Sequence, residues 1–374
     1  MSGAAVGTAA LNVRVRTKLA GEGQPFSLEV ELAAGAGFTI LFGASGSGKT
    51  TLLDCIAGLR TPDSGRIAVG GTTLFDSEAR VDVPPSRRGV GYLLQSLALF
   101  PHLTVQQNVE YGLADSSGAE RDARARQILD LFRIGHLGQR RPAELSGGER
   151  QRAALARTLV TQPRVLLLDE PLTALDALTK SQILEDLRAW NREHQIPIVY
   201  VTHQREEVFA LGERVIALEN GRVIAQGSPH EVLHRPEFES VAQLAGFENI
   251  LEATFVAAHP EQGTMTCRVG DSALTLEVPL TRIEQQRELR IGIRAGDILV
   301  ALDRPDGLSA RNVFAGTITS LERRDVMLIA RVDCGAEFEV HMTPGAGDSL
   351  RLRVGGSVWL VVKTYSCQVL QGRD

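Results

Sequence analysis

The sequence predicts an α/β domain followed by a small all-β domain. From Leu28 to about Gly227, short apolar runs that end in Gly, Asp or His alternate with longer helical stretches. This alternation is typical of a mostly parallel sheet covered by helices. From Leu251 onward, apolar and polar residues alternate with the period of half-buried antiparallel strands. With 374 residues, the chain is also too long for one compact core of ordinary size.

Composition and charge disfavour several classes of protein. Hydrophobic residues make up 43% of the chain and charged residues 23%, as in ordinary soluble proteins, which argues against extensive disorder. The apolar runs are far shorter than the roughly 20 residues that span a bilayer, and the N-terminus lacks the pattern of a secretory signal. A net charge of −5 offers no general attraction for a phosphate backbone, so we expect no nucleic-acid partner. The four cysteines lack any C-x-x-C spacing, which favours plain reduced thiols in a cytosolic protein.

The first chemical motif is GASGSGKT, from Gly43 to Thr50. It follows the apolar run Phe38 to Phe42 and precedes a predicted helix from Lys49 to about Ala57, which is the context that a P-loop requires. Its glycines let successive backbone N–H groups point at phosphate oxygens, beside the positive end of the helix. Lys49 is expected to reach the β- and γ-phosphates, and Thr50 to bind Mg²⁺. The predicted nucleotide-binding residues of this segment are Gly43, Ala44, Ser45, Gly46, Ser47, Gly48, Lys49, Thr50 and Thr51.

Between Leu97 and Arg157 the strand pattern disappears, which predicts an inserted helical subdomain over about residues 97–157. Near its end, LSGGERQR places Ser146, Gly147 and Gly148 at the start of a helix. A helix start of this kind is a second anion-binding site, which the P-loop does not need. We therefore expect it to serve a different nucleotide.

Three further apolar runs each lead into a candidate catalytic segment. The stretch Arg164 to Pro171 ends in Asp169, placed to hold Mg²⁺, and in Glu170, placed to act as the general base on the attacking water. The strand Ile198 to Val201 is followed by His203, and the run Val90 to Leu94 by Gln95. We expect both side chains at the same sheet edge, in contact with the γ-phosphate or its water. The predicted catalytic residues are Glu170, His203, Gln95 and Lys49, and the predicted metal ligands are Thr50, Gln95 and Asp169.

The end of the first domain is predicted from a hairpin and a change of period. Val215 to Glu219 and Arg222 to Ala225 flank Asn220-Gly221, a pair that favours a type I′ turn. We place the catalytic domain at residues 1–235, a linker at 236–250 and the β domain at 251–374. Strands are expected around Leu289 to Ile293, Leu328 to Val332 and Leu350 to Val354. Ile293 to Asp297 and Val362 to Ser366 resemble each other, as an internal repeat or by chance.

Taken together, GASGSGKT, Gln95, LSGGERQR, LLLDEP (Leu166 to Pro171) and His203 resemble the ordered motifs of ATP-binding cassette (ABC) ATPases. The resemblance covers roughly Leu28 to Gly227 and implies a P-loop NTPase fold with ATP and Mg²⁺. It also implies a head-to-tail homodimer, in which the LSGGE segment of one subunit covers the ATP held by its partner. By the same resemblance, Ala174-Leu175-Asp176 couples the two sites through Asp176. Phe26, the one aromatic residue between Val13 and Ser27, is either the adenine platform or part of the core.

The segment after Gln95 indicates which kind of ABC ATPase the chain resembles. The run SLALFPHLTVQQNVEYGL after Gln95 is similar to the segment with which importer ATPases touch their membrane subunits; the alternative is a plain surface loop. This implies two copies docked on transmembrane permease subunits at the cytoplasmic face of the inner membrane. An extracytoplasmic binding protein would complete the importer.

The C-terminal third carries the resemblance that concerns the cargo. Leu289 to Leu302, SARN at Ser309 to Asn312 and VKTYS at Val362 to Ser366 resemble the small OB-like (TOBE) domain of molybdate-binding proteins and molybdate importer ATPases. The alternative is that this domain only stabilises the dimer. The sequence therefore predicts the ATPase subunit of a molybdate importer. The alternatives are an importer ATPase for another solute, such as sulfate, sugar or polyamine, and a soluble cassette protein acting on ribosomes or DNA. The implied oxyanion ligands are Ser309, Arg311, Asn312, Lys363 and Ser366.

Overall fold

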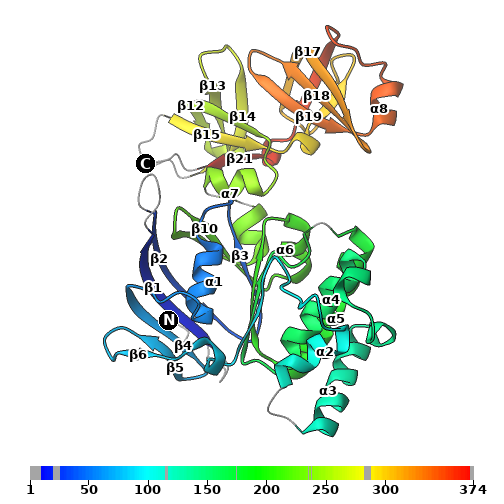
Figure 1. Ribbon diagram of the computed structural model, residues 1–374. Coiled ribbons are helices and arrows are strands. Elements are labelled where there is room, and N and C mark those ends of the chain that lie inside the picture. Colours follow the sequence, from blue (N-terminus) through cyan, green and yellow to red (C-terminus); the bar gives the residue numbers. More distant parts are fainter. Residues whose placement is uncertain are drawn as a thin grey trace. The chain divides into compact units, whose positions relative to one another are not determined.

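The computed structural model in Figure 1 describes residues 10–19, 26–113, 117–173, 175–234, 236, 238–281 and 288–370. The chain divides into two units, Met1–Pro229 and His230–Asp374. The first unit is built on one mixed sheet with helices, and the second on two antiparallel sheets. The predicted fold class, an α/β domain followed by an all-β domain, is confirmed.

The centre of the first unit is a parallel sheet of buried strands. All five residues of one strand, Val165–Asp169, and all six of its neighbour, Pro197–Thr202, are buried. Their near-continuous apolar sequence follows from burial on both faces. The adjacent parallel strands are, in order, β7 (Val90–Leu93), β8 (Val165–Asp169), β9 (Pro197–Thr202), β3 (Gly37–Phe42) and β10 (Arg214–Glu219).

The same sheet continues into a mainly antiparallel region, in which only the described pair of β11 (Arg222–Gly227) and β2 (Phe26–Ala34) is parallel, and this differs from the mostly parallel sheet predicted. Apolar and polar residues alternate in Leu11–Leu19, and the burial of its side chains alternates with them. One face of this strand is therefore exposed, as antiparallel sheets allow. The turn of the predicted hairpin has positive φ at both Asn220 (47°) and Gly221 (77°), as expected. Beyond β10 the order is β11 (Arg222–Gly227), β2 (Phe26–Ala34), β1 (Leu11–Leu19), β4 (Ser64–Val69), β5 (Thr72–Asp76) and β6 (Val81–Asp82).

Helices pack on the sheet and form a separate group beside it. Helix α1 (Lys49–Ala57) buries Leu52, Leu53 and Ile56 in the same core as the sheet. Between β7 and β8 the described residues form helices and turns without a strand, which agrees with the predicted helical stretch (Figure 1). In α3 (Gly118–Leu131) the apolar residues Ile128 and Leu129 are buried, as is Phe132 just after it. The remaining α-helices of this unit are α2 (Val105–Glu110), α3 (Gly118–Leu131), α4 (Gly147–Leu159), α5 (Ala177–His194) and α6 (Arg205–Leu211).

The second unit consists of two halves with the same strand order. Each half is a run of five successive described strands. The first strand of the run lies between the second and the fourth in one sheet, and the fifth strand joins the sheet of the other half. The similarity between Ile293 to Asp297 and Val362 to Ser366 is therefore part of a structural repeat, since each segment joins a fourth strand to a fifth through a 3₁₀ turn. One sheet contains β12 (Asn249–His259), β13 (Thr264–Val269), β14 (Thr275–Pro279), β15 (Glu288–Ile293) and β21 (Cys367–Leu370). The other contains β17 (Asn312–Arg324), β18 (Met327–Asp333), β19 (Glu337–Met342), β20 (Ser357–Val362) and β16 (Leu299–Ala301).

Two equivalent asparagines join the two sheets. The Asn249 carboxamide donates to the Glu339 carbonyl (2.9 Å) and accepts from its N–H (2.7 Å). Asn312 makes the same pair of bonds with Glu277, at 2.9 and 2.7 Å. Both asparagines are buried, and both begin the first strand of their half. The asparagine of SARN is thus one copy of a repeated structural device.

Two sequence predictions in this unit differ from the structure. The alternating residues Leu350, Leu352 and Val354 form no strand, because they follow helix α8 (Pro344–Ser349) and the chain turns back on it. Arg351 has φ 49°, and the Leu352 N–H donates to the Gly347 carbonyl. The stretch predicted as a linker, 236–250, holds helix α7 (Glu239–Leu244) and the start of β12, inside the second unit.

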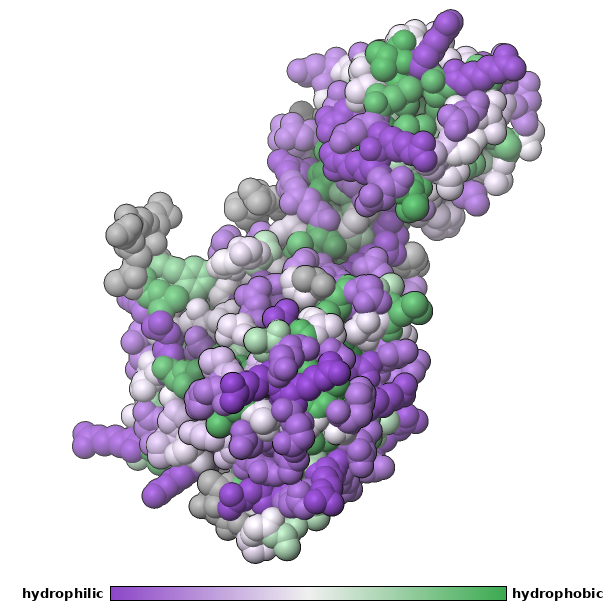
Figure 2. Space-filling model, turned by 45° about the vertical axis from the view of Figure 1, so that its right-hand side comes forward, coloured by the Kyte–Doolittle hydropathy of each residue, from purple (hydrophilic) through white to green (hydrophobic). Residues whose placement is uncertain are grey.

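Among the described residues, no helix is long and apolar enough to cross a bilayer. Figure 2 shows a face on which hydrophilic side chains predominate and apolar side chains are scattered in small groups. Scattered apolar side chains of this kind are normal on protein surfaces.

Candidate functional site

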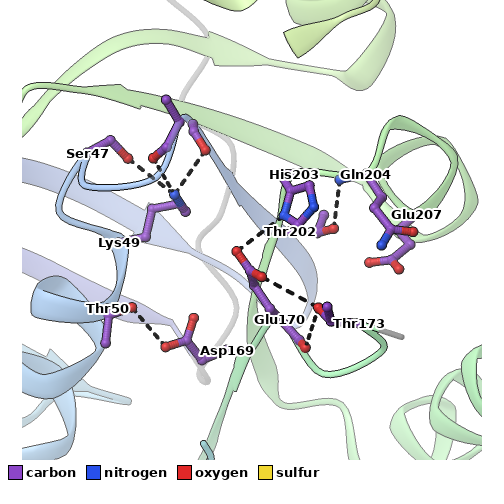
Figure 3. Close-up of polar contacts among 12 residues, drawn as sticks. Ser47, Lys49, Thr50, Asp169, Glu170, Thr173, Thr202, His203, Gln204 and Glu207 are labelled. Carbon is purple, nitrogen blue, oxygen red and sulfur yellow. Dashed lines mark hydrogen bonds and ion pairs between the residues drawn. The ribbon is translucent and has the colours of Figure 1, made fainter. Parts of the chain in front are cut away.

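The predicted catalytic segments of the first unit meet at one edge of the parallel sheet. Strands β7, β8, β9 and β3 are neighbours and run in the same direction. Their carboxyl ends lead into Gln95, Asp169, His203 and the P-loop, so that all four segments lie along the same edge. This is where ligands bind in open α/β sheets. Figure 3 shows three of the four segments.

The P-loop connects strand β3 to helix α1, as predicted, and its Gly43, Gly46 and Gly48 have positive φ. Gly48, just before α1, has φ 104°, and a side chain there would collide with Phe26 and Leu28. The Lys49 ammonium is buried and donates to the carbonyls of Gly43 (2.9 Å) and Ala44 (2.7 Å). Burial lowers the pKa of Lys49, and the nearby carboxylates of Glu170 and Asp169 oppose this shift. Ala44, Ser45, Gly46 and Thr50 are exposed, Ser47 is buried and Thr51 is half-buried.

Thr50 and Asp169 place two oxygen ligands side by side. The Thr50 hydroxyl donates to Asp169 Oδ2 at 2.9 Å, across 119 positions of sequence. Asp169 is buried, which raises its pKa, and the hydrogen bond from Thr50 opposes the shift. A hydroxyl and one carboxylate, completed by phosphate oxygens and water, are the hard ligands that Mg²⁺ prefers. The residues present therefore fit the predicted ion.

Glu170 is held in an unfavourable backbone conformation beside His203. Its φ of 46° is rare for a residue with a side chain. The Glu170 N–H donates to the Val201 carbonyl (3.1 Å), and the Thr173 hydroxyl donates to the Glu170 carbonyl (3.1 Å). Its carboxylate lies 3.2 Å from His203 Nδ1 (Figure 3). The backbone thus aims a partly exposed carboxylate at the sheet edge, next to an exposed imidazole.

Gln95 lies in a tight turn at the exit of β7. The Leu97 N–H donates to the Leu94 carbonyl at 2.9 Å, which closes the turn around Gln95 and Ser96. The Gln95 side chain is exposed. It therefore extends from the same sheet edge as Glu170 and His203, as the sequence predicted.

Ser146, Gly147, Gly148 and Asp176 line a different cavity, of about 410 Å³. Ser146 caps α4: its hydroxyl accepts from the Glu149 N–H (3.3 Å), and the Glu149 carboxylate accepts from the Ser146 N–H (2.7 Å). These bonds leave the Ser146 O–H hydrogen available to an anion. The first two N–H groups of the helix belong to glycines, so an anion can approach closely. The full lining is Arg133, Ile134, His136, Leu137, Ser146, Gly147, Gly148, Glu149, Arg152, Leu175, Asp176 and Thr179.

Asp176 joins this cavity as the N-cap of α5. Its carboxylate accepts from the hydroxyl (2.6 Å) and the N–H (3.0 Å) of Thr179, and these bonds lower its pKa. Ala174, predicted to belong to the same segment, lies outside the described residues. The structure thus brings the predicted coupling residue next to the LSGGE segment, and P-loop residues are not part of this lining.

Phe26, the candidate adenine platform, is half-buried at the start of β2 and packs on the core. Its ring also lies beside Gly48 of the P-loop. This position agrees with either role that the sequence left open.

The candidate oxyanion residues of the second unit are only partly available. Asn312 pairs with the strand backbone, so its carboxamide is already engaged. Asn312 lies opposite Val362 in the antiparallel β17–β20 ladder. Arg311, just before β17, and Lys363, just after β20, therefore lie at the same end of the ladder. Both side chains are exposed, as is Ser309, and Ser366 is half-buried.

Sequence reasoning missed several residues of both sites. Thr173 holds Glu170, and its place three residues after the predicted base was a usable signal. Arg133 and His136 line the cavity at α4 but precede LSGGERQR by about ten residues, and no pattern in the sequence links them to it.

Two family models match the chain. One, described as ABC transporter, matches residues 27–173, and the other, described as TOBE domain, matches residues 308–369. A molybdenum import ATP-binding protein ModC of Rhizobium meliloti is 42% identical over 95% of this chain and 99% of its own length. The protein of the same name from Mesorhizobium japonicum is 40% identical over 91% of this chain and 92% of its own length.

Solved structures are similar to a large part of the chain. The dimeric ATP-binding cassette MJ0796, bound to ADP and Pi in a post-hydrolysis state, covers 59% of this chain and 98% of its own, with 30% identity and a TM-score of 0.52. A protein from Clostridium perfringens, part of the ABC transporter complex cbiONQ, covers 60% of this chain and 90% of its own, with 29% identity and a TM-score of 0.53.

Proposed function

The chain belongs to the ABC transporter ATPases, in the group of molybdenum import ATP-binding proteins, and we propose that it hydrolyses ATP to energise molybdate uptake. The observation that carries this proposal is the meeting of the P-loop, Asp169, Glu170, His203 and Gln95 at one sheet edge. Two findings support molybdate as the cargo. The TOBE domain model matches residues 308–369, and relatives named for molybdenum import align over both units.

The side chains at the edge divide the chemistry of hydrolysis among them. Lys49 and the P-loop N–H groups hold the β- and γ-phosphates, and Thr50, Asp169 and Gln95 would hold Mg²⁺, which would neutralise charge on the phosphate oxygens. Glu170 accepts a proton from the attacking water. His203, 3.2 Å from Glu170, orients that carboxylate and contacts the γ-phosphate.

We propose that two copies of the chain form a head-to-tail dimer. The cavity at Ser146 presents helix N–H groups and a hydroxyl to an anion, yet its lining contains no P-loop residue. Such a site can complete a reaction centre only for nucleotide held elsewhere. The γ-phosphate bound by the partner's P-loop is a suitable ligand, and Asp176 lies in the same lining to couple the two sites. The dimeric cassette found among the similar structures supports this arrangement.

ATP binding then closes the dimer, and the loop after Gln95 passes the closure to transmembrane permease subunits. The protein works as a peripheral subunit on the cytoplasmic face of the inner membrane, and an extracytoplasmic binding protein delivers the oxyanion. The loop offers an aromatic surface for this contact: Phe100 packs on Tyr111 (ring centroids 4.5 Å), and Tyr111 is 62% exposed.

Uptake measurements test the proposed function. Cells that lack the protein are expected to lose molybdate accumulation at limiting molybdate, and the wild-type chain restores it. Molybdenum is measured by mass spectrometry, with sulfate, sugar and polyamine uptake followed in parallel. Unchanged molybdenum together with loss of one of the other solutes would assign the ATPase to that cargo instead.

We also propose that the second unit binds the transported oxyanion as feedback, through Ser309, Arg311, Lys363 and Ser366. Two cations and two hydroxyls at one end of β17 and β20 suit a tetrahedral oxyanion. Asn312 is assigned a structural role instead, because it joins the sheets.

Molybdate is accordingly expected to stabilise the full-length protein against heat. A ligand at about 100 times its Kd stabilises the folded state by about 2.7 kcal/mol. Arg311→Ala should abolish the shift, whereas Arg353→Ala, which removes another exposed arginine of the same unit, should keep it. Scanning calorimetry with and without molybdate measures both. An unchanged wild-type melting curve at saturating molybdate would leave this unit with a purely structural role.

A further inference from the structure

The turn that carries Gln95 leads into an unfavourable stretch of backbone. After the turn closed by Leu97 N–H and Leu94, both Leu97 (φ 59°) and Ala98 (φ 45°) are left-handed. Residues with side chains adopt this conformation only where surrounding contacts impose it. Two successive residues of this kind need an external restraint.

Arg157 supplies that restraint. Its guanidinium donates to the carbonyls of both strained residues, from Nη1 to Ala98 (2.6 Å) and from Nη2 to Leu97 (2.8 Å). The same group lies over the Phe100 ring, 5.4 Å from its centroid. Burial lowers the pKa of Arg157, but a guanidinium remains charged at neutral pH. Its planar fork suits two adjacent carbonyls in a way that a lysine ammonium cannot reproduce.

Arg157 also belongs to the helix that begins at the LSGGE segment. It stands eleven positions after Ser146, the N-cap of α4, which corresponds to about 16.5 Å along a helix. The N-terminal end of α4, at Ser146, therefore lines the cavity proposed for the partner's nucleotide. Near its C-terminal end, Arg157 hydrogen-bonds the turn next to the protein's own proposed ATP site.

The downstream part of the loop is fixed separately. Asn108 of α2 is fully buried, accepts from the Phe100 N–H (2.8 Å) and donates to the Phe100 carbonyl (3.1 Å). Loss of the Arg157 contacts would thus release the turn while the loop beyond Phe100 keeps its own anchor.

We propose that Arg157 is a positioning residue, which holds Gln95 in place for hydrolysis and connects it to the LSGGE end of α4. This inference rests on the proposed ATPase function and on the proposed contact of Gln95 with Mg²⁺ and the γ-phosphate. Arg157 acts through the backbone of Leu97 and Ala98 and does not touch the nucleotide. It adds to the proposed function a physical link between the two nucleotide sites of one subunit.

A double-mutant cycle tests this role. In the full-length protein, Arg157→Lys should lower kcat about tenfold and change the KM for ATP less than about twofold, because positioning in the transition state is lost. The Mg²⁺ concentration that gives half the maximal rate should rise about fivefold, as it should for Gln95→Ala. The double variant should be no slower than the slower single variant, since both changes remove the same interaction.

The control is Arg126→Lys, an exposed arginine on neighbouring α3 that pairs with Asp122, and it should match the wild type. Thermal melting is recorded for every variant. Multiplicative losses in the double variant, or a lower melting temperature with unchanged kcat and Mg²⁺ dependence, would reduce Arg157 to a structural residue. A wild-type protein without ATPase activity would instead overturn the proposed function itself.

Discussion

A Glu170→Gln variant is expected to hydrolyse ATP about 10²- to 10³-fold more slowly than the wild type, because a carboxamide cannot accept the proton of the attacking water. Gln has nearly the same shape, and the backbone bonds that hold position 170 involve Val201 and Thr173, not the carboxylate. Binding of ATP should therefore persist, with an affinity within about twofold. The arrested variant should accumulate as a closed dimer in the presence of Mg²⁺ and ATP.

Phosphate release measures the rate, and light scattering after size-exclusion chromatography measures the dimer. Lys49→Ala provides the contrast, since loss of the P-loop ammonium should weaken nucleotide binding and prevent the dimer from accumulating. Glu193→Gln, an exposed change on α5, is the matched control for the substitution itself. Near-normal phosphate release by Glu170→Gln would remove Glu170 from the role of general base.

The catalytic edge was predictable because local pattern and global fold agree there. Apolar runs at Gly37–Phe42, Val165–Asp169 and Pro197–Thr202 each end in a chemical motif, and buried parallel strands deliver their ends to one edge. The helix start at Lys49 and the turn at Asn220 also follow from local rules. Neither depends on a distant partner in the sequence.

Features set by distant contacts were not predictable. The left-handed conformation of Glu170 depends on Val201 and Thr173, and nothing in LLLDEP indicates it. Asn312 was predicted to be an oxyanion ligand. Its actual role, the link between the two sheets, depends on Glu277, which lies 35 positions away and cannot be identified as its partner from the sequence pattern. Leu350 to Val354 alternate as a strand does, but helix α8 precedes them and the chain folds back. Pattern alone does not distinguish these cases.

The pair Arg87 and Arg88 illustrates the same limit. The two residues are adjacent and identical in type, yet Arg87 is exposed whereas Arg88 is only 1% exposed. The Arg88 guanidinium donates to the carbonyls of Cys55 (2.8 Å) and Ile56 (2.9 Å), in the last turn of α1. It also bonds the Val83 carbonyl (2.7 Å) and the Asp82 carboxylate (2.9 Å). A buried cation thus caps the negative end of the helix whose other end begins at the P-loop.

Arg88→Ala should therefore destabilise the first unit by about 3 to 5 kcal/mol, because several buried carbonyls lose their donor and a cavity remains. Arg88→Met, which restores most of the volume but no donor, should recover only the part due to the cavity. Arg87→Ala should change stability by less than about 0.5 kcal/mol. Urea unfolding followed by circular dichroism measures all three. If Arg88→Met proved as stable as the wild type, the hydrogen bonds to α1 would contribute nothing, and the buried charge would need another explanation.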